Sequence, residues 1–354
     1  MPDEAPTLVL TQGDPAGIGP EIIVRMAFEE LAQRERDSRA ARWRPLLVAE
    51  RAAFEPLRAA LPDLPWQRLQ TVKTIDDPLA LTAALDAVHT AGDVPVVEPE
   101  VEPTSPDARH VVPGKPSAAD AHGALAALDR GVALVRGGVG AALVTAPLSK
   151  AEIARHLLPD FRGHTDYLAE GAGLTRYGRD YLMAFLAPRL KVALLSTHIP
   201  LRAALDAVTV DAVLDALRCL HRNATGRIAV AGLDPHAGEG GLLGSADAEI
   251  LAPAVARARA EGIDAHGPES ADSLFARTVR GAFDWVLALY HDQGLIAVKT
   301  AAFGDATNWT LGLPYLRTSV DHGTAYDLAG TGTARIDSLR AVVATTLEQL
   351  AESS

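Results

Sequence analysis

The sequence predicts an α/β fold in which a largely parallel sheet is covered by helices, and two observations carry that prediction. Short apolar runs that end in a polar turn recur along the chain, and each is followed by a stretch of helical character. The chain has 354 residues, 48% of them hydrophobic and 22% charged, which is enough for two domains with sizeable cores. The same composition excludes a disordered chain.

The N-terminal part supplies the first of these repeats. Thr7–Leu10 is a strand candidate, and it is followed by a Gly/Pro turn and a helical stretch over residues 21–34. Pro45–Glu50 is expected to form a second strand. Residues 113–138 predict a helix with Ser117 at its N-cap, because a hydroxyl there accepts a hydrogen bond from the first turn. Gly140–Lys150 is expected to be a buried strand that ends in a polar turn.

The middle and the end of the chain repeat the pattern. Residues 190–196 run into Thr197 and His198, and residues 227–233 run into Asp234 and His236. Helices are expected over Val208–Arg222 and Ala246–Glu261. A last helix, from about residue 338 to 350, should pack on the body of the fold because its apolar residues share one face, namely Leu339, Val342, Val343, Leu347 and Leu350.

Charge and cysteine usage exclude several functions. The formal net charge of -12 argues against a nucleic-acid partner, which normally meets a basic face. The single Cys219 excludes an intramolecular disulfide and a thiolate metal cluster. The first residues, MPDEAPTLVL, are acidic where a signal peptide is basic, and no run approaches about 18 apolar residues. We therefore expect a cytoplasmic protein without a membrane partner.

The turn after the first strand contains Gly13, Gly17 and Gly19. Free N–H groups at the following helix start would suit an anion. The spacing matches neither the dinucleotide fingerprint nor the P-loop, so a tight structural turn remains an equal alternative.

The stretch Tyr290–Gly330 is the strongest candidate for a ligand cradle. An apolar run over Trp285–Tyr290 stops at His291, Asp292 and Gln293, which is where open α/β sheets bind ligands. Lys299, Asn308 and Arg317 then follow at steps of nine residues and offer two cations and an amide to a phosphate or carboxylate. The alternative is a polar surface loop whose charges pair with nearby aspartates.

His198, His236 and His291 each follow an apolar strand candidate and open a loop. Because strand ends on one edge of a sheet can converge, these imidazoles suggest a shared divalent metal, zinc above all, with cobalt, manganese or magnesium as alternatives. Each histidine alone would more often be structural. His164, next to Thr165, is interpreted as a substrate contact.

Seven motifs in register make a family resemblance explicit. The motifs GDPAGIGPE, TAPLSK, GHTDY, STHIPL, GLDPHAGEGG, YHDQG and NWTLGLPYLRTSVDHGTA span nearly the whole chain. In this order they resemble the 4-hydroxythreonine-4-phosphate dehydrogenase family of vitamin B6 biosynthesis. The resemblance implies a homodimer of two-domain α/β/α subunits, similar to isocitrate and isopropylmalate dehydrogenases, with the active site in the interdomain cleft. The expected domains are residues 1–150 with 282–354, and residues 151–281, the second serving dimerisation and part of the metal site.

Matched motif by motif, the resemblance also assigns residues. His198, His236 and His291 are implied metal ligands, and with Lys299 they form the implied catalytic set. His164, Thr165, Lys299, Asn308 and Arg317 are implied substrate contacts, whereas no residue is assigned to the cofactor. The implied reaction is NAD(P)-dependent oxidation of the C3 hydroxyl of 4-phosphooxy-L-threonine, whose β-keto product loses CO2 to give 3-amino-2-oxopropyl phosphate.

Three positions differ from the usual family pattern, and they concern the substrate. Asp234 stands where Asn is usual, Asp166 where Glu is commoner, and Trp309 replaces a smaller residue as an expected wall of the cradle. Oxidation of 4-phospho-threonate or of an aromatic cis-dihydrodiol therefore remains an alternative. A module that binds a phosphorylated metabolite without catalysis is the alternative of a different class.

Overall fold

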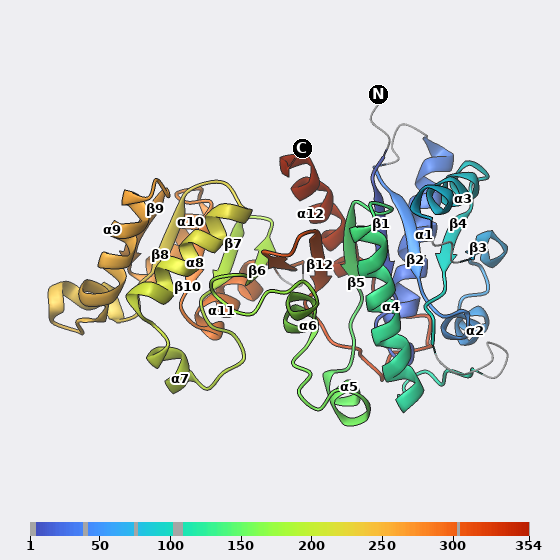
Figure 1. The fold of residues 1–354 in the computed structure, drawn as a ribbon, viewed down its shortest axis with the longest axis horizontal. Helices are drawn as coiled ribbons and strands as arrows, with labels where there is room; N and C mark the ends of the chain where they lie inside the picture. Colours follow the sequence, from blue (N-terminus) through green and yellow to red (C-terminus); the bar gives the residue numbers. More distant parts are fainter. Residues whose placement is uncertain (1–4, 38–41, 74–76, 102–108, 303–304, 354) are drawn as a thin grey trace. The chain divides into compact units, whose positions relative to one another are not determined.

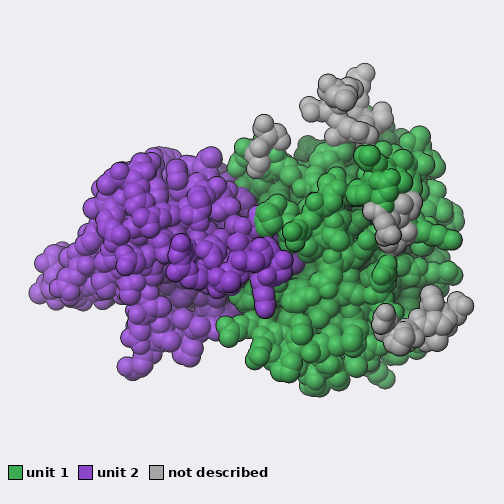
Figure 2. All heavy atoms as spheres, viewed as in Figure 1, with its two compact units in different colours: residues 1–167, 314–354 green, residues 168–313 purple. Residues whose placement is uncertain are grey.

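The computed structural model describes residues 5–37, 42–73, 77–101, 109–302 and 305–353. It divides into two compact units (Figure 1), and Figure 2 shows them in separate colours. Unit 1 consists of residues 1–167 and 314–354, and unit 2 of residues 168–313. Both are built from mostly parallel strands and helices, which confirms the predicted fold class. The expected domains, residues 1–150 with 282–354 and residues 151–281, stay a prediction.

Unit 1 contains a parallel sheet in the order β3-β4-β2-β1-β5-β12. Its strands are β1 (Thr7–Thr11), β2 (Arg44–Val48), β3 (Leu69–Val72), β4 (Val94–Val97), β5 (Ala142–Thr145) and β12 (Leu316–Val320). Its helices are α1 (Gly19–Arg36), α2 (Arg51–Ala60), the 3-10 turn η1 (Trp66–Arg68), α3 (Pro78–Thr90), α4 (Ala118–Arg136), α5 (Lys150–His156) and α12 (Asp337–Ser353). Helix α6 (His164–Gly171) contains the boundary between the units.

Local sequence explains several of these elements. Ser117 caps α4 as expected and forms a capping box with Asp120, so two N–H groups at the helix start are satisfied reciprocally. The apolar face predicted for the last helix is also confirmed. Leu339, Val342 and Val343 of α12 lie in the core of unit 1, which explains why α12 packs on this sheet.

In unit 2, the sheet strands follow one another in the order β11-β6-β7-β10-β8-β9. Its strands are β6 (Leu182–Ala187), β7 (Leu190–Leu194), β8 (Ile228–Ala231), β9 (Ala265–Glu269), β10 (Trp285–Ala288) and β11 (Thr307–Leu311). Its helices are α7 (Leu201–Asp206), α8 (Val210–Asn223), α9 (Ala252–Ala260), α10 (Ala271–Val279) and α11 (His291–Ala302), with irregular turns η3 (Pro235–Gly241) and η4 (Asp247–Leu251).

Unit 2 departs from parallel pairing at β6. This strand is antiparallel to both β7 and β11. Only Pro188 and Arg189 separate β6 from β7, and so short a connection can only reverse the chain.

The stretch after Tyr290 differs from the expected loop. His291 is the first residue of α11, a helix of 12 residues, and two strands follow it. The apolar residues Leu295 and Val298 are three positions apart and are buried in the core of unit 2. This helical spacing, which the surrounding polar residues obscure in the sequence, explains why the segment forms a helix. Within the described ranges, no helix combines the length and apolar character needed to cross a membrane.

Candidate active site

In unit 2, three histidines follow three neighbouring strands. Strand β10 pairs in parallel with β7 on one side and with β8 on the other, so the carboxyl ends of all three lie at one edge of the sheet. His198 follows β7, His236 follows β8 and His291 follows β10. The expectation that these histidines leave the same edge of a parallel sheet is therefore met.

His198 and His291 lie next to each other. Their ring centroids are 5.4 Å apart and the rings are inclined at 46°. The hydroxyl of Ser196 donates a hydrogen bond of 2.9 Å to the carbonyl of Leu289, which joins the two strand ends. Nδ1 of His291 lies 2.7 Å from Oδ1 of Asp292. A carboxylate oxygen accepts, so it favours the tautomer with the proton on Nδ1, in which Nε2 has the lone pair that a metal would need.

His236 lies in a left-handed turn. Residues 236–240 all have positive φ, and three of them are not glycine: His236 (φ 53°), Ala237 (φ 52°) and Glu239 (φ 44°). Such a run is strained, because each non-glycine residue in this region costs about 1–2 kcal/mol. Strain concentrated around one histidine indicates that the chain is held there by its surroundings.

Two side chains hold this turn, and neither was assigned from the sequence. The buried carboxylate of Asp247 accepts hydrogen bonds from the N–H groups of Leu233 (3.0 Å) and Asp234 (2.8 Å). The amide of Gln293 donates to the carbonyl of Gly232 at 2.8 Å and accepts from the N–H of Leu289 at 2.7 Å. Gln293 therefore fastens the His236 turn to the strand that leads to His291.

A divalent metal is implied by the family resemblance, and the donor set can be tested against it. Two adjacent imidazoles, one of them oriented by a carboxylate, suit zinc or a similar ion. Among the described residues, however, no group of three or more His, Cys, Asp or Glu side chains is placed to hold a metal. The pair His198 and His291 fits a partial site, and the full set with His236 stays a prediction.

Unit 1 has a second group of polar side chains, which come from β12, the end of β5 and the start of α6. Arg317 is 1% exposed, and its Nη2 donates a hydrogen bond of 2.5 Å to Oγ1 of Thr145. Burial lowers the pKa of Arg317 to about 9, so the guanidinium is still charged at neutral pH. Burial also lowers the pKa of the His164 imidazole, and the charges of Arg317 and Lys150 lower it further. These basic groups are therefore close to one another.

The five expected substrate contacts divide between the units. His164, Thr165 and Arg317 belong to unit 1, while Lys299 and Asn308 belong to unit 2. Lys299 lies eight residues after His291 in α11, or about 12 Å along the helix axis at 1.5 Å per residue. Oδ1 of Asn308 is buried and makes no hydrogen bond within the part of the chain that is described. An amide oxygen in this state indicates a place for a ligand donor.

Trp309 does not line the same face as Asn308. Successive residues of β11 point to opposite faces of the sheet. The indole of Trp309 is 9% exposed and packs on Trp285, with ring centroids 6.2 Å apart. The expectation that it forms a wall beside Asn308 is therefore wrong, because the strand period places it in the interior.

The glycine turn of unit 1 has a structural explanation. Gly13 has φ of 65°, and a Cβ there would lie 2.1 Å from the carbonyl oxygen of Pro147. A Cβ on Gly19 would lie 1.9 Å from the carbonyl oxygen of Gln12. Close backbone packing thus explains both glycines, and no phosphate site is needed to account for them.

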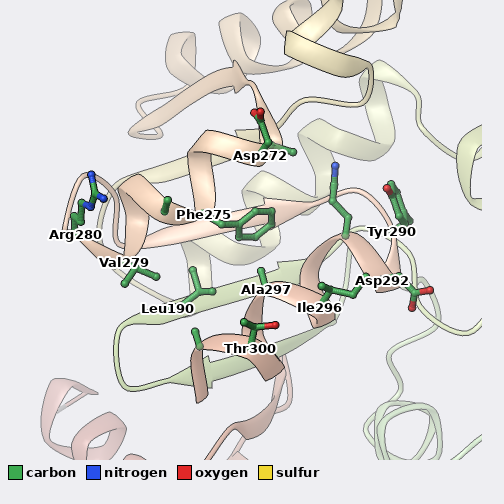
Figure 3. A pocket seen from close by; sticks show the side chains of 14 residues that line it. Leu190, Asp272, Phe275, Val279, Arg280, Tyr290, Asp292, Ile296, Ala297 and Thr300 are labelled. Atoms are coloured by element: carbon green, nitrogen blue, oxygen red, sulfur yellow. The ribbon is translucent and has the colours of Figure 1, made fainter. Parts of the chain in front are cut away.

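A groove of about 700 Å³ lies between α10 and α11 in unit 2, and Figure 3 shows its side chains. Leu190, Phe275 and Ala297 give it apolar walls, and the nearby Ile296 is 68% exposed. In Figure 3, Asp272 lies above Phe275 and Arg280 lies to its left. The groove is a candidate surface for a partner or a ligand.

The parallel sheets, with polar side chains gathered at their carboxyl ends, define an α/β protein of the class that binds small ligands at strand ends. Comparison with known proteins narrows this class. A sequence model of the family described as pyridoxal phosphate biosynthetic protein PdxA matches residues 42–346.

Individual relatives agree over nearly the full length. A 4-hydroxythreonine-4-phosphate dehydrogenase of Acidithiobacillus ferrooxidans is 41% identical over 94% of this chain and 93% of its own. A D-threonate 4-phosphate dehydrogenase of Bordetella bronchiseptica is 40% identical over 96% of this chain and 91% of its own. The crystal structure of 4-hydroxythreonine-4-phosphate dehydrogenase from Klebsiella pneumoniae superposes with a TM-score of 0.79 at 34% identity, covering 99% of each chain.

The chain belongs to the PdxA family, as the seven motifs predicted. It is an oxidoreductase that acts on a CH–OH group, so the non-catalytic binding module is excluded.

Proposed function

We propose that this chain oxidises the C3 hydroxyl of 4-phosphooxy-L-threonine with NAD or NADP, and that the β-keto acid product decarboxylates to 3-amino-2-oxopropyl phosphate. The observation that carries the proposal is the full-length similarity to relatives named for this dehydrogenase. The basic groups around Arg317 support it, because a phosphorylated substrate needs cationic partners. The relatives are bacterial metabolic enzymes, which also supports a cytoplasmic location.

The chain's own residues would bind and orient the substrate. His164, Thr165 and Arg317 are proposed contacts from unit 1, and Lys299 and Asn308 from unit 2. Lys299 is also proposed to act in catalysis, as an amine near the reacting hydroxyl. A bound nicotinamide cofactor would supply the hydride acceptor, and a divalent ion held by His198, His236 and His291 would lower the pKa of the hydroxyl.

The substrate is tested with a panel under matched conditions. The purified chain is mixed with NAD or NADP and with zinc, magnesium or cobalt, and the absorbance of reduced nicotinamide is followed. The candidates are 4-phosphooxy-L-threonine, both threonate 4-phosphates and an aromatic cis-dihydrodiol. We expect the highest kcat/KM for 4-phosphooxy-L-threonine. A higher kcat/KM for a threonate 4-phosphate, the substrate in the name of the Bordetella relative, would show that the proposed substrate is wrong. The proposed reaction type, oxidation of a hydroxyl, would still hold.

For the metal, we propose zinc held by His198, His236 and His291. The adjacent rings of His198 and His291 and the carboxylate of Asp292 beside Nδ1 of His291 support this proposal. The variants His198→Ala and His291→Ala should lose bound zinc, measured by elemental analysis, while thermal unfolding is little changed. His266→Ala is the matched control, because His266 also pairs with a neighbouring aspartate in unit 2. Full zinc content in His291→Ala would refute the assignment.

We further propose that the chain is a homodimer and that a second copy occupies the groove between α10 and α11. Asp272 and Arg280 lie at opposite ends of α10, so a two-fold axis would bring each next to its opposite charge. A hydrogen bond from Ser270 lowers the pKa of Asp272, and the nearby His236 lowers it further, so this histidine lies near the groove. A second copy there could complete the set of metal ligands.

The dimer is tested by sedimentation equilibrium. Ile296→Asp places a charge on the exposed apolar rim and should give a monomer. Leu79→Asp, at a residue of unit 1 that is 81% exposed, is the matched control and should remain a dimer. A dimeric Ile296→Asp variant would exclude this groove as the interface.

A further inference from the structure

One charged residue near the basic group of unit 1 has no role so far. Lys150 is the first residue of α5, directly after its N-cap Ser149. A helix start favours acidic residues, because its free N–H groups carry partial positive charge. A lysine there adds to the positive potential, so α5 itself does not explain the choice of residue.

The side chain of Lys150 lies beside Gly163, the residue before His164. A Cβ on Gly163 would lie 2.8 Å from Cε and 3.4 Å from Nζ of Lys150. The lysine stem therefore lies over Gly163, immediately before His164. The small size of Gly163, with φ of 131°, leaves room for this path.

A second basic residue, Arg317, acts on the same histidine as Lys150 and is held in place. Arg317 is buried in β12 and anchored to Thr145 at the end of β5. Lys150 and Arg317 both act on His164, and both oppose its protonation. Two positive charges near a neutral imidazole repel additional positive charge and attract an anion.

Charge matching points to a doubly charged ligand group. Lys150 and Arg317 carry two positive charges at neutral pH, and a phosphate monoester carries about two negative charges. A carboxylate would neutralise only one of them. Unlike Arg317, Lys150 is exposed, so its ammonium is accessible to an incoming ligand.

We propose that Lys150 is a further substrate-binding residue, which together with Arg317 and His164 binds the phosphate group of the substrate and selects a dianion over a carboxylate. This inference rests on the proposed function, because it assigns one end of the proposed substrate to unit 1.

The test uses inorganic phosphate on the full chain, with acetate as the monoanion. Calorimetry measures affinity, and NMR of labelled histidines, assigned with His164→Gln, locates the ion. We expect phosphate to shift the His164 signals and acetate to leave them. Lys150→Met should weaken phosphate binding by about tenfold, equivalent to about 1.4 kcal/mol, and Lys150→Arg should restore most of it. Lys73→Met is the control, since Lys73 follows β3 at the other edge of the sheet.

Unchanged phosphate affinity in Lys150→Met, phosphate binding that leaves His164 unshifted, or acetate binding as tight as phosphate would each overturn the inference. In turnover, Lys150→Met should raise KM far more than it lowers kcat. If no substrate is oxidised while phosphate still binds in a Lys150-dependent way, the proposed function fails and this site stands. If Lys150→Met oxidises the substrate with an unchanged KM, the proposed role of Lys150 is wrong and the proposed function still stands.

Discussion

The buried carboxylate of Asp247 offers the sharpest test of how the chain presents His236. We predict that Asp247→Ala releases the left-handed turn at residues 236–240 without unfolding the rest of unit 2. The reason is that Asp247 supplies both side-chain acceptors for the N–H groups of Leu233 and Asp234, which directly precede this turn.

The expected loss of local stability follows from two opposing free energies, that of the hydrogen bonds to Asp247 and that of the backbone strain in the turn. Each hydrogen bond to a charged acceptor is worth about 1.5–3 kcal/mol, so the two together contribute about 3–6 kcal/mol. The three non-glycine residues with positive φ store about 1–2 kcal/mol each, so their strain is also about 3–6 kcal/mol. Because the two quantities are comparable, loss of the carboxylate leaves the strain unopposed and the turn should relax.

Hydrogen exchange measures this relaxation directly. In Asp247→Ala, the amides of residues 232–246 should exchange about a hundredfold faster or more, as expected for a local loss of about 3 kcal/mol. The amides of β7 and β10 should keep their protection, and bound zinc should decrease. Asp211→Ala removes an 82% exposed carboxylate of the same unit and serves as the control. Unchanged exchange in residues 232–246 would refute the reasoning.

Three further predictions concern unit 1 and the core. Burial lowers the pKa of His89 to about 4. As the pH falls from 6.5 to 4, this histidine therefore binds a proton in the unfolded chain but stays mostly neutral in the folded chain. Stability should fall by about 2–3 kcal/mol over this window, and His89→Gln should lose that dependence in urea titrations. Gly13→Ala should destabilise the chain by about 2 kcal/mol or more, since its Cβ meets the carbonyl oxygen of Pro147; an unchanged urea midpoint would contradict this. Burial raises the pKa of the Cys219 thiol to about 11, so iodoacetamide should label it only after unfolding, as mass spectrometry would show.

Much of the fold was predictable because local patterns and packing agree. The Ser117 cap, the strands at Thr7 and Pro45 and the apolar face of α12 all follow from spacing within one segment. The placement of His198, His236 and His291 at one sheet edge was also predictable, since parallel strands end on the same side. The family followed from motif order alone.

Other features depended on contacts between distant segments. The helix at His291 was missed because its polar residues hid the few apolar ones that face the core. Trp309 was assigned to the cradle, whereas strand alternation turns it onto Trp285. Asp247 lies outside the seven motifs, and Gln293 lies in YHDQG but received no role from it. Both side chains act on backbone groups that only the folded chain brings within reach.

The sequence by itself therefore determined the α/β class, the family and the chemical types available at the strand ends. Periodicity and motif order are properties of neighbouring residues, and they survive without coordinates. Only the tertiary structure decided which of those groups meet. It paired His198 with His291, put His236 on a strained turn, and gathered Lys150, His164 and Arg317, because proximity across tens of residues arises from packing and not from spacing.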